Sequence, residues 1–339
     1  MSNVPTKEQF EGCLIGQCVG DALGFIVEGH PPEVCRGYVE DTLDKGQPGE
    51  RRRGRYAFGQ YSDDSQLARE LMQSYVARGR FDPEDYARRI ATIFLEDRIV
   101  GRGRATEEAA VRLNRGMPWQ EAGTRPPSAG NGSAMRAGPV GLLFFDDLKR
   151  LAQAAHDQGV ITHRDARCSA GAVAIAGAVA LALRNEPVDS SEFTFRLGEL
   201  VREIDPSFAS GIRQLPGWVF VCPEEAVELI SRAGFEPGYP DGWRGISPFV
   251  VSSVLWSLYS FLKSPEDYQE TIRIAIAVGG DVDTTAAMAG AISGAHLGVG
   301  AVPSNLAERL TDQGSWGLDE LERLAGEGYK LKMQQLDLS

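Results

Sequence analysis

Alternation of apolar and polar residues, the pattern of a half-buried β-strand, is scarce in this chain. Apolar residues instead recur three and four positions apart, which is the spacing of one face of a helix. The first such helix is predicted over residues 7–22, ahead of Gly24. Its apolar stripe consists of Phe10, Leu14, Cys18 and Ala22. Because this pattern supports helix packed on helix, and no linker or fixed-period repeat is found, we predict a single compact all-α domain over residues 1–339.

Helical patterns continue along the chain between segments rich in glycine, proline and charge. Ser62 is a favoured N-cap, and Asp63 and Asp64 follow it in the first turn, where carboxylates suit the helix dipole. Glycines spaced four apart, from Gly290 to Gly298, leave a stripe without Cβ atoms that another helix can approach closely. The later helices are predicted over residues 62–76, 83–96, 98–118, 165–183, 248–263, 266–278 and 283–296, with short helices in 185–250 and irregular segments at 29–60 and 122–138.

The charge balance and the cysteines limit the classes of function. Lysines and arginines number 35 and acidic residues 47, and the formal net charge of −12 disfavours binding to nucleic acid or anionic membranes. The longest apolar stretch, residues 168–183, is shorter than the ~18–20 residues of a membrane-spanning helix. Five cysteines without a zinc-site spacing predict reduced core thiols, and the N-terminus has no signal-peptide pattern. We therefore expect a cytoplasmic monomer without membrane or nucleic-acid partners.

Two groups of carboxylates lie far apart in the sequence but together have the composition of a metal site. The group Ser62-Asp63-Asp64 is, on its own, explained by capping of a helix. The second group, Asp281-Val282-Asp283-Thr284, follows two glycines and precedes a helix of small residues. Four carboxylates with the hydroxyls of Ser62 and Thr284 form a set of hard oxygen ligands, which suits Mg²⁺ or Mn²⁺ rather than zinc. The two groups therefore predict a site for divalent cations.

Three other segments are candidate contacts for an anionic ligand. The segment from Gly130 to Arg136 has glycines on both sides of Asn131, which permit positive φ and close approach of the backbone. Free N–H groups in such a turn form a nest for phosphates, and a plain surface turn is the equally weighted alternative. A single histidine such as His163 is more often a packed or capping group than a catalyst. The run from Glu50 to Arg55 is most simply a solvated loop, and otherwise a contact for a protein or an anionic substrate.

Taken together, these segments resemble the ADP-ribosylglycohydrolases, whose bacterial type is the dinitrogenase reductase-activating glycohydrolase. A further segment, Gly20-Asp21-Ala22-Leu23-Gly24 followed by Glu28, belongs to the same likeness. The likeness spans residues 12 to about 302, and its most specific part is the last segment. In the family's order the five segments are residues 20–28, 62–65, 130–136, 162–163 and 279–290.

The resemblance implies an orthogonal multi-helix fold with a binuclear centre of Mg²⁺ or Mn²⁺. It implies that Glu28 lies near the metals as a ligand or a gate, and that Asp63, Asp64 and Glu28 carry the catalysis. The metal ligands that it implies are Ser62, Asp63, Asp64, Asp281, Asp283 and Thr284. The residues that it places against an ADP-ribose moiety are Gly130, Asn131, Gly132, Ser133, Met135 and His163.

The chain departs from the family pattern at three places. Ser62 and Ser65 flank the first aspartate pair where threonines are usual, which keeps the hydroxyl ligand. Val282 stands between the two late aspartates in place of a threonine and loses a hydroxyl. Residues 25–27 are Phe-Ile-Val rather than a small residue and proline, which affects how Glu28 is placed.

We therefore predict an Mg²⁺- or Mn²⁺-dependent hydrolase that cleaves the glycosidic bond between ADP-ribose and an acceptor, arginine on a protein before others, and so reverses mono-ADP-ribosylation. Serine-linked ADP-ribose and O-acetyl-ADP-ribose are alternative substrates. A catalytically silent ADP-ribose-binding relative is the alternative function, against which the intact carboxylate set argues. An isoprenoid-synthase-type enzyme does not fit, because Leu67 stands where the DDxxD pattern needs an aspartate.

Overall fold

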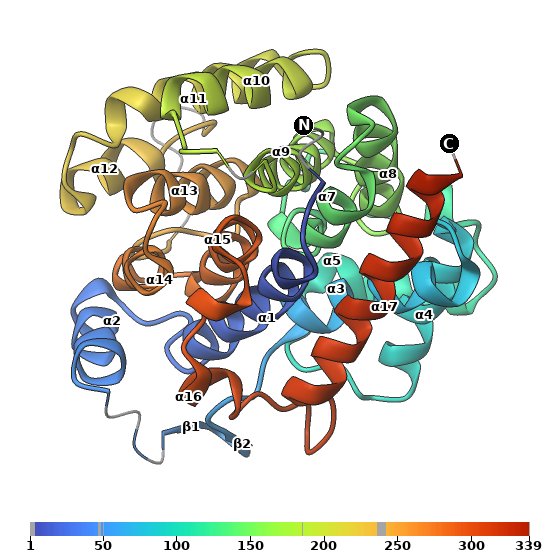
Figure 1. Ribbon diagram of the computed structural model, residues 1–339, viewed down its shortest axis with the longest axis horizontal. Helices are drawn as coiled ribbons and strands as arrows, with labels where there is room; N and C mark the ends of the chain where they lie inside the picture. Colours follow the sequence, from blue (N-terminus) through green and yellow to red (C-terminus); the bar gives the residue numbers. More distant parts are fainter. Residues whose placement is uncertain (1–3, 47–48, 50, 185, 236–241, 339) are drawn as a thin grey trace.

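The computed structural model describes residues 4–46, 49, 51–184, 186–235 and 242–338. Figure 1 shows helices packed on helices throughout, and the only sheet of the described ranges is a two-stranded antiparallel hairpin of β1 (Arg52–Arg53) and β2 (Tyr56–Ala57). The prediction of an all-α fold is confirmed. The α-helices are α1 (Lys7–Phe25), α2 (Pro32–Val39), α3 (Asp63–Arg78), α4 (Pro83–Leu95), α5 (Arg104–Asn114), α6 (Trp119–Ala122), α7 (Gly138–Phe144), α8 (Leu148–Val160), α9 (Ala166–Ala182), α10 (Ser190–Arg202), α11 (Pro206–Trp218), α12 (Pro223–Ile230), α13 (Val250–Lys263), α14 (Tyr268–Ala277), α15 (Val282–Leu297), α16 (Ser304–Ala307) and α17 (Leu318–Asp337).

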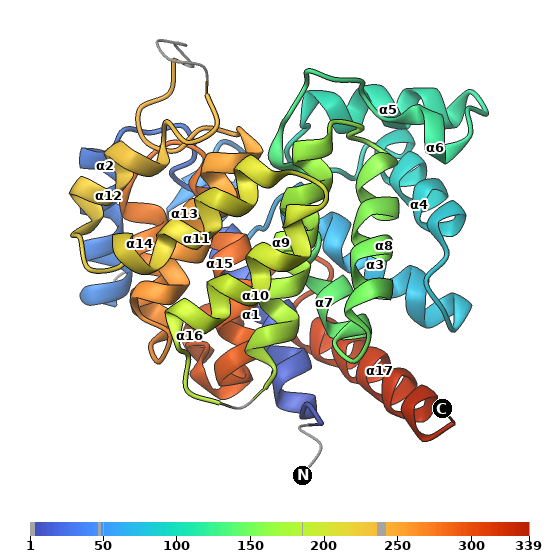
Figure 2. The same cartoon turned by 90° about the horizontal axis from the view of Figure 1, so that it is seen from above.

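One hydrophobic core runs through these helices, and α1 and α15 lie at its centre. The two helices are side by side in both Figure 1 and Figure 2. From Val282 to Ala295 every residue of α15 is buried, as is every residue of α9 from Cys168 to Ala182. A helix that is enclosed on all sides needs small residues more than an amphipathic stripe, which is why both helices consist largely of alanine and glycine.

Glycines on α1 and α15 face each other and bring the two backbones into contact. A Cβ added at Gly16 would lie 2.6 Å from the carbonyl oxygen of Gly290, and one at Gly12 would lie 2.2 Å from that of Gly294. The predicted stripe is therefore confirmed at Gly290 and Gly294. Gly298 ends α15 with a φ of +79°, and its backbone also lies against α1, since a Cβ at Gly12 would lie 2.7 Å from the carbonyl carbon of Gly298.

The prediction of an irregular segment at residues 29–60 is wrong in part. Pro31 and Pro32 begin α2, since proline is well suited to the first turn of a helix, and a π-helix at Glu40–Asp44 continues it. The first helix also runs past Gly24 to Phe25, because Gly24 faces α15 instead of ending α1. Residue 50 and residues 236–241, parts of two predicted segments, lie outside the described residues.

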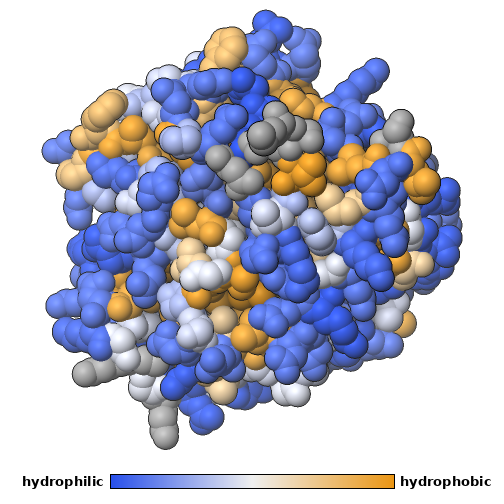
Figure 3. Space-filling view, in the orientation of Figure 1, coloured by the Kyte–Doolittle hydropathy of each residue, from blue (hydrophilic) through white to orange (hydrophobic). Residues whose placement is uncertain are grey.

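The surface and the cysteines agree with a globular protein. Hydrophilic side chains cover most of the face in Figure 3, and the apolar ones form small separated groups. Within the described ranges, no helix combines the length and the hydropathy that crossing a membrane requires. The predicted buried free thiols are Cys13, Cys18, Cys35 and Cys168, while Cys222 is free but exposed.

Candidate metal and ligand site

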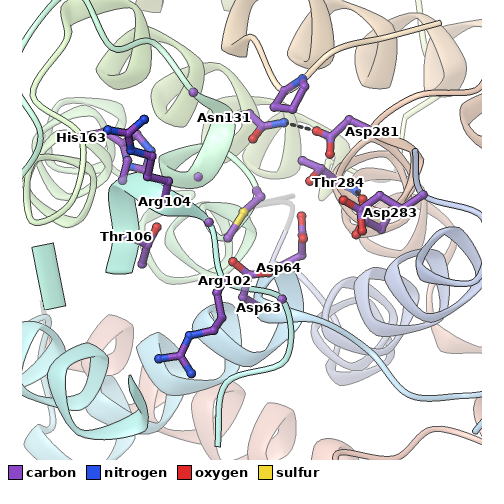
Figure 4. Close-up of a pocket in the computed structure, with 18 of the residues that line it drawn as sticks. Asp63, Asp64, Arg102, Arg104, Thr106, Asn131, His163, Asp281, Asp283 and Thr284 are labelled. Carbon is purple, nitrogen blue, oxygen red and sulfur yellow. Dashed lines mark hydrogen bonds between the residues drawn. The ribbon is translucent and has the colours of Figure 1, made fainter. Parts of the chain in front are cut away.

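The two predicted carboxylate groups meet in space at the N-terminal ends of α3 and α15. Ser62 is the N-cap of α3, and its hydroxyl donates to Asp64 Oδ2 at 2.9 Å. Asp281 is the N-cap residue of α15, and Asp283 lies in its first turn. Figure 4 shows the carboxylates of the two helices on facing sides of one pocket. The folding of two distant helix starts into one site is what the sequence pattern predicted.

Asp21 on α1 joins these two groups. Its carboxylate accepts hydrogen bonds from the backbone N–H groups of Ser62 and Ser65, each at 2.9 Å, so α1 caps the start of α3. Gly24 packs on the other group, since a Cβ there would lie 2.4 Å from the Cα atom of Asp283. Burial raises the pKa of Asp21 to about 6. Asp21 belongs to the segment Gly20–Gly24, but no role was predicted for it. An aspartate within an apolar helix was the signal that could have indicated one.

Side-chain oxygens gather here in two overlapping sets of three carboxylates. Asp21, Asp64 and Asp283 offer oxygens that lie within 4.8 Å of one another, and Glu28, Asp281 and Asp283 do the same. Both sets share Asp283. Oxygen atoms from carboxylates at this spacing are the ligands that hard divalent cations take.

The electrostatics of the two sets favour a bound cation. Burial, with smaller contributions from nearby carboxylates, raises the pKa of Asp63 and of Asp281 to about 7 and raises the pKa of Asp64 and of Asp283 as well. Asp64 Oδ1 is buried and has no hydrogen-bond partner among the residues that the structure describes. A buried polar atom without a partner costs free energy that a metal–oxygen contact would remove. The donor set therefore fits a divalent cation.

Glu28 reaches the pocket from the loop after α1 and is held by an arginine of the basic run. Arg53 on β1 forms an ion pair with Glu28 and donates to the carbonyl oxygen of Phe25 at 2.9 Å. Its guanidinium carbon also lies 4.5 Å from the centre of the Phe25 ring. The solvated-loop interpretation of this run is therefore wrong for Arg53, although the structure does not describe Glu50.

A cavity of about 400 Å³ opens above the carboxylates, which is within the usual size of a small-molecule site. Ser62 and Ser133 do not line it: Ser62 caps α3, and the Ser133 hydroxyl donates to the carbonyl oxygen of Cys168 at 2.9 Å. The other predicted site residues all do, namely Glu28, Asp63, Asp64, Gly130, Asn131, Gly132, Met135, His163, Asp281, Asp283 and Thr284.

The loop around Asn131 forms another wall of the cavity and is bonded to the carboxylates. Asn131 Nδ2 donates to Asp281 Oδ2 at 2.6 Å, as Figure 4 shows, and its backbone N–H donates to the Pro248 carbonyl at 3.0 Å. An anion nest would therefore use neighbouring N–H groups. The expected positive φ is not found at either glycine. Close approach explains Gly132 instead, because a Cβ at this residue would lie 2.5 Å from Cε1 of His163.

The segment Gly101-Arg102-Gly103-Arg104, which was not predicted as part of the site, lines the cavity at the start of α5. Gly101 has a φ of +77°, and a Cβ there would lie 2.5 Å from Oδ1 of Asp63. We predicted a helix over 98–118, whereas two glycines within three residues were the signal for a break. The helix begins only at Arg104.

Val282, the position of a missing hydroxyl, does not face the cavity. Its side chain is fully buried in the hydrophobic core, and its carbonyl oxygen lies against Gly24 of α1. The loss of a hydroxyl at this position therefore leaves the lining of the cavity unchanged.

The comparison with known proteins agrees with this geometry. A model of the ADP-ribosylglycohydrolase family matches residues 2–337. The chain belongs to this family. Among its relatives, ADP-ribosylhydrolase ARH3 of Gallus gallus is 31% identical, over 98% of this chain and 95% of that protein. ADP-ribosylarginine hydrolase Tri1 of Pseudomonas putida (strain GB-1) is 26% identical, over 94% of this chain and 77% of that protein.

A solved structure has the same fold as this glycohydrolase. It is described as an ADP-ribosylglycohydrolase-related protein complex, and it superposes with a TM-score of 0.69 at 27% identity, over 96% of this chain and 99% of that one. The resemblance inferred from the five segments is confirmed, and the chain is an enzyme of the ADP-ribosylglycohydrolase family.

Proposed function

We propose that this glycohydrolase releases ADP-ribose from an ADP-ribosylated protein side chain with the help of two Mg²⁺ or Mn²⁺ ions. The observation that carries the proposal is the pair of three-carboxylate sets that share Asp283 beneath a ligand-sized cavity. We assign the ions to these sets, with Ser62 and Thr284 as neutral oxygen ligands. The opposite wall, formed by the Asn131 loop and His163, would receive the diphosphate.

The acidic net charge does not prevent binding of an anionic ligand at this site. The protein carries −12 overall, and an ADP-ribose moiety adds two phosphates. Two divalent ions would offset four of the five carboxylate charges in the two sets, and backbone N–H groups on the facing loop suit phosphate oxygens. Affinity for ADP-ribose therefore depends on the cations in this proposal.

Cleavage of the glycosidic bond passes through an oxocarbenium-like state, which nearby carboxylates stabilise. Bound divalent ions supply orientation of ribose hydroxyls and polarisation of a water molecule. In our proposal Asp63 or Asp64 orients the attacking water from α3. Glu28, which Arg53 holds at the cavity wall, assists the departure of the leaving group.

Arginine is the acceptor that we propose first. The relative Tri1 is named for ADP-ribosylarginine, which is the acceptor linkage that this proposal puts first. Serine-linked ADP-ribose and O-acetyl-ADP-ribose are the alternatives. The relatives named ARH3 reach higher identity than Tri1, and their name specifies no acceptor.

A parallel assay tests the function and the acceptor together. Peptides carrying ADP-ribosyl-arginine or ADP-ribosyl-serine, and O-acetyl-ADP-ribose, are incubated with the protein in Mg²⁺, in Mn²⁺ and in chelator, and released ADP-ribose is quantified. We expect release from the arginine conjugate with either metal and none in chelator. Release of ADP-ribose from only one of the other two substrates would show that its acceptor, and not arginine, is the one that the enzyme uses. Binding of ADP-ribose without release from any substrate would establish the silent relative and refute the proposal.

A further inference from the structure

Arg136 is a fully buried cation directly behind the Asn131 loop. It forms an ion pair with no carboxylate in the part of the chain that the structure describes. Its guanidinium donates instead to the side chain and the carbonyl oxygen of Gln158 and to the Thr162 hydroxyl, each at 2.8 Å. A guanidinium has no acceptor atom, so the direction of the bond to Thr162 is fixed.

The direction of this bond fixes the next one. Thr162 Oγ1 lies 2.8 Å from Nδ1 of His163, and both residues are buried. The hydroxyl has one proton, and among the described residues His163 Nδ1 is the one acceptor within its reach. Donation from Thr162 to Nδ1 satisfies both groups. The opposite direction would leave the hydroxyl proton buried without an acceptor, which costs free energy.

The imidazole of His163 is uncharged, so the position of its single proton matters. Burial, and next the positive charge of Arg136, lower the pKa of His163 to about 3. A neutral imidazole carries a proton on one nitrogen and a lone pair on the other. If Nδ1 accepts from Thr162, the proton is on Nε2.

Nε2 is the nitrogen on the side of the Asn131 loop. A Cβ added at Gly130 would lie 3.5 Å from Nε2, and one at Gly132 would lie 3.1 Å from it. Both glycines and His163 line the cavity. The absence of a Cβ atom at Gly132 leaves room for the ring, whereas a Cβ at Gly130 would be in ordinary van der Waals contact with it, and the edge of the ring borders the wall assigned to the diphosphate.

We propose that Arg136 and Thr162 are positioning residues that hold His163 as the Nε2–H tautomer, which makes this histidine a fixed hydrogen-bond donor to an anionic oxygen in the cavity. The identity of that oxygen, a phosphate of ADP-ribose, rests on the proposed function. The tautomer does not, because it follows from the bonds among Arg136, Thr162 and His163 alone.

The tautomer can be measured by nitrogen NMR on protein labelled with ¹⁵N-histidine. The chain has four histidines, and the signals of His163 are those that disappear in His163→Gln. We expect an unprotonated Nδ1 and a protonated Nε2 at neutral pH. In Thr162→Val, which keeps the shape of the side chain without the hydroxyl, we expect a mixture of tautomers. Thr162→Ser should restore the wild-type spectrum. A wild-type spectrum with the proton on Nδ1 overturns the proposal, whatever the variants do.

Calorimetry with ADP-ribose and Mg²⁺ tests the consequence for the ligand. Only molecules with the proton on Nε2 can donate, so an even mixture of tautomers predicts that Thr162→Val binds roughly 2-fold more weakly. The loss rises toward roughly 10- to 100-fold if the proton moves almost wholly to Nδ1 and the hydrogen bond to the charged group is lost, and Thr162→Ser should bind as the wild type does. Thr194→Val is the matched control, because Thr194 is equally buried but lies on α10 with its hydroxyl bonded to the Ser190 carbonyl. Its affinity should be unchanged.

The two measurements separate the possible failures. Wild-type affinity in a folded Thr162→Val variant would overturn the role of the hydroxyl in binding. A wild-type protein that binds no ADP-ribose would overturn the proposed function, while the NMR spectrum would still decide the tautomer. If Thr162→Val does not fold, the wild-type and Thr162→Ser spectra decide the proposal between them.

Discussion

Replacement of Gly20 by alanine tests how closely α1 and α15 must pack. A Cβ at Gly20 would lie 2.2 Å from the carbonyl oxygen and 2.7 Å from the carbonyl carbon of Ala286. Non-bonded heavy atoms ordinarily lie roughly 3.5–4.0 Å apart. The obstacle is backbone rather than a side chain that could rotate away, so the helices would have to separate by about 1 Å or more.

The effect of Gly20→Ala on the free energy of unfolding can be placed within limits. Overpacking of a close contact destabilises by ~1–3 kcal/mol, and a rigid obstacle favours the upper end of that range. Replacement of a helical glycine by alanine offsets ~0.5–1 kcal/mol of this. The upper end of the range less this offset leads us to expect that Gly20→Ala lowers the free energy of unfolding by about 2 kcal/mol. Turnover should also fall, because Asp21 and Asp283 lie on the two helices that are forced apart.

Urea unfolding followed by circular dichroism, in chelator and in Mg²⁺, measures the effect. The matched control is Gly37→Ala on α2, where an added Cβ meets nothing within 4 Å. That variant should gain ~0.5–1 kcal/mol from the better helix propensity of alanine. If Gly20→Ala proves as stable as Gly37→Ala, the argument from backbone contact between α1 and α15 is refuted.

Three further predictions concern the carboxylates. Asp281→Ala, which removes an assigned ligand, and Asp63→Ala, which removes a carboxylate proposed to orient the attacking water, should each reduce turnover by more than the ~10- to 100-fold that loss of an outer-shell partner of a metal costs, with the circular dichroism spectrum unchanged. An active, folded Asp281→Ala variant would contradict the ligand assignment, and an active, folded Asp63→Ala variant would leave the water to Asp64. In chelator, unfolding measured from pH 4 to pH 8 should show that stability falls as the pH rises. Burial raises the pKa of Asp281 to about 7, so the contribution of this residue to stability is full below the unfolded pKa near ~4 and is lost as the pH rises through about 7. Saturating Mg²⁺ should remove this decline in stability. Arg53→Ala should change the free energy of unfolding by less than ~1 kcal/mol, because the ion pair of Arg53 with Glu28 is partly exposed. The same variant should lower turnover nearly as far as Glu28→Gln does. Unchanged turnover would show that Glu28 needs no partner.

The parts of the site that the sequence predicted are those that follow from local pattern. Ser62, Asp63 and Asp64 cap and begin a helix, and Asp281 and Asp283 do the same for another, so their positions on their own helices could be deduced. That the two groups meet in space could be inferred from their composition, because together they supply the carboxylate and hydroxyl oxygens of a divalent-cation site.

The parts that were missed depend on which helices become neighbours. Asp21 acts by capping α3 from α1, and no spacing within either helix shows that these two helices meet. Arg53 reaches Glu28 across 25 residues from a short hairpin with no periodic pattern of its own. Gly130 and Gly132 predicted a special backbone conformation, whereas the structure shows a different role for Gly132, which leaves space for the ring of His163.

The hydrogen bond between Asn131 and Asp281 joins the loop at one wall of the cavity to a carboxylate at its floor. Asp281 accepts a hydrogen bond from the Asn131 amide and also belongs to the assigned cation site. A change in the position of Asn131 therefore alters the free energy of cation binding, and cation binding alters the free energy of this hydrogen bond. Cation and diphosphate are then thermodynamically linked, and the factor by which the ion raises the affinity for the nucleotide equals the factor by which the nucleotide raises the affinity for the ion. A metal titration with and without ADP-ribose therefore measures this coupling, which contains the contribution of the 2.6 Å contact and that of the direct bonds of the ions to the ligand.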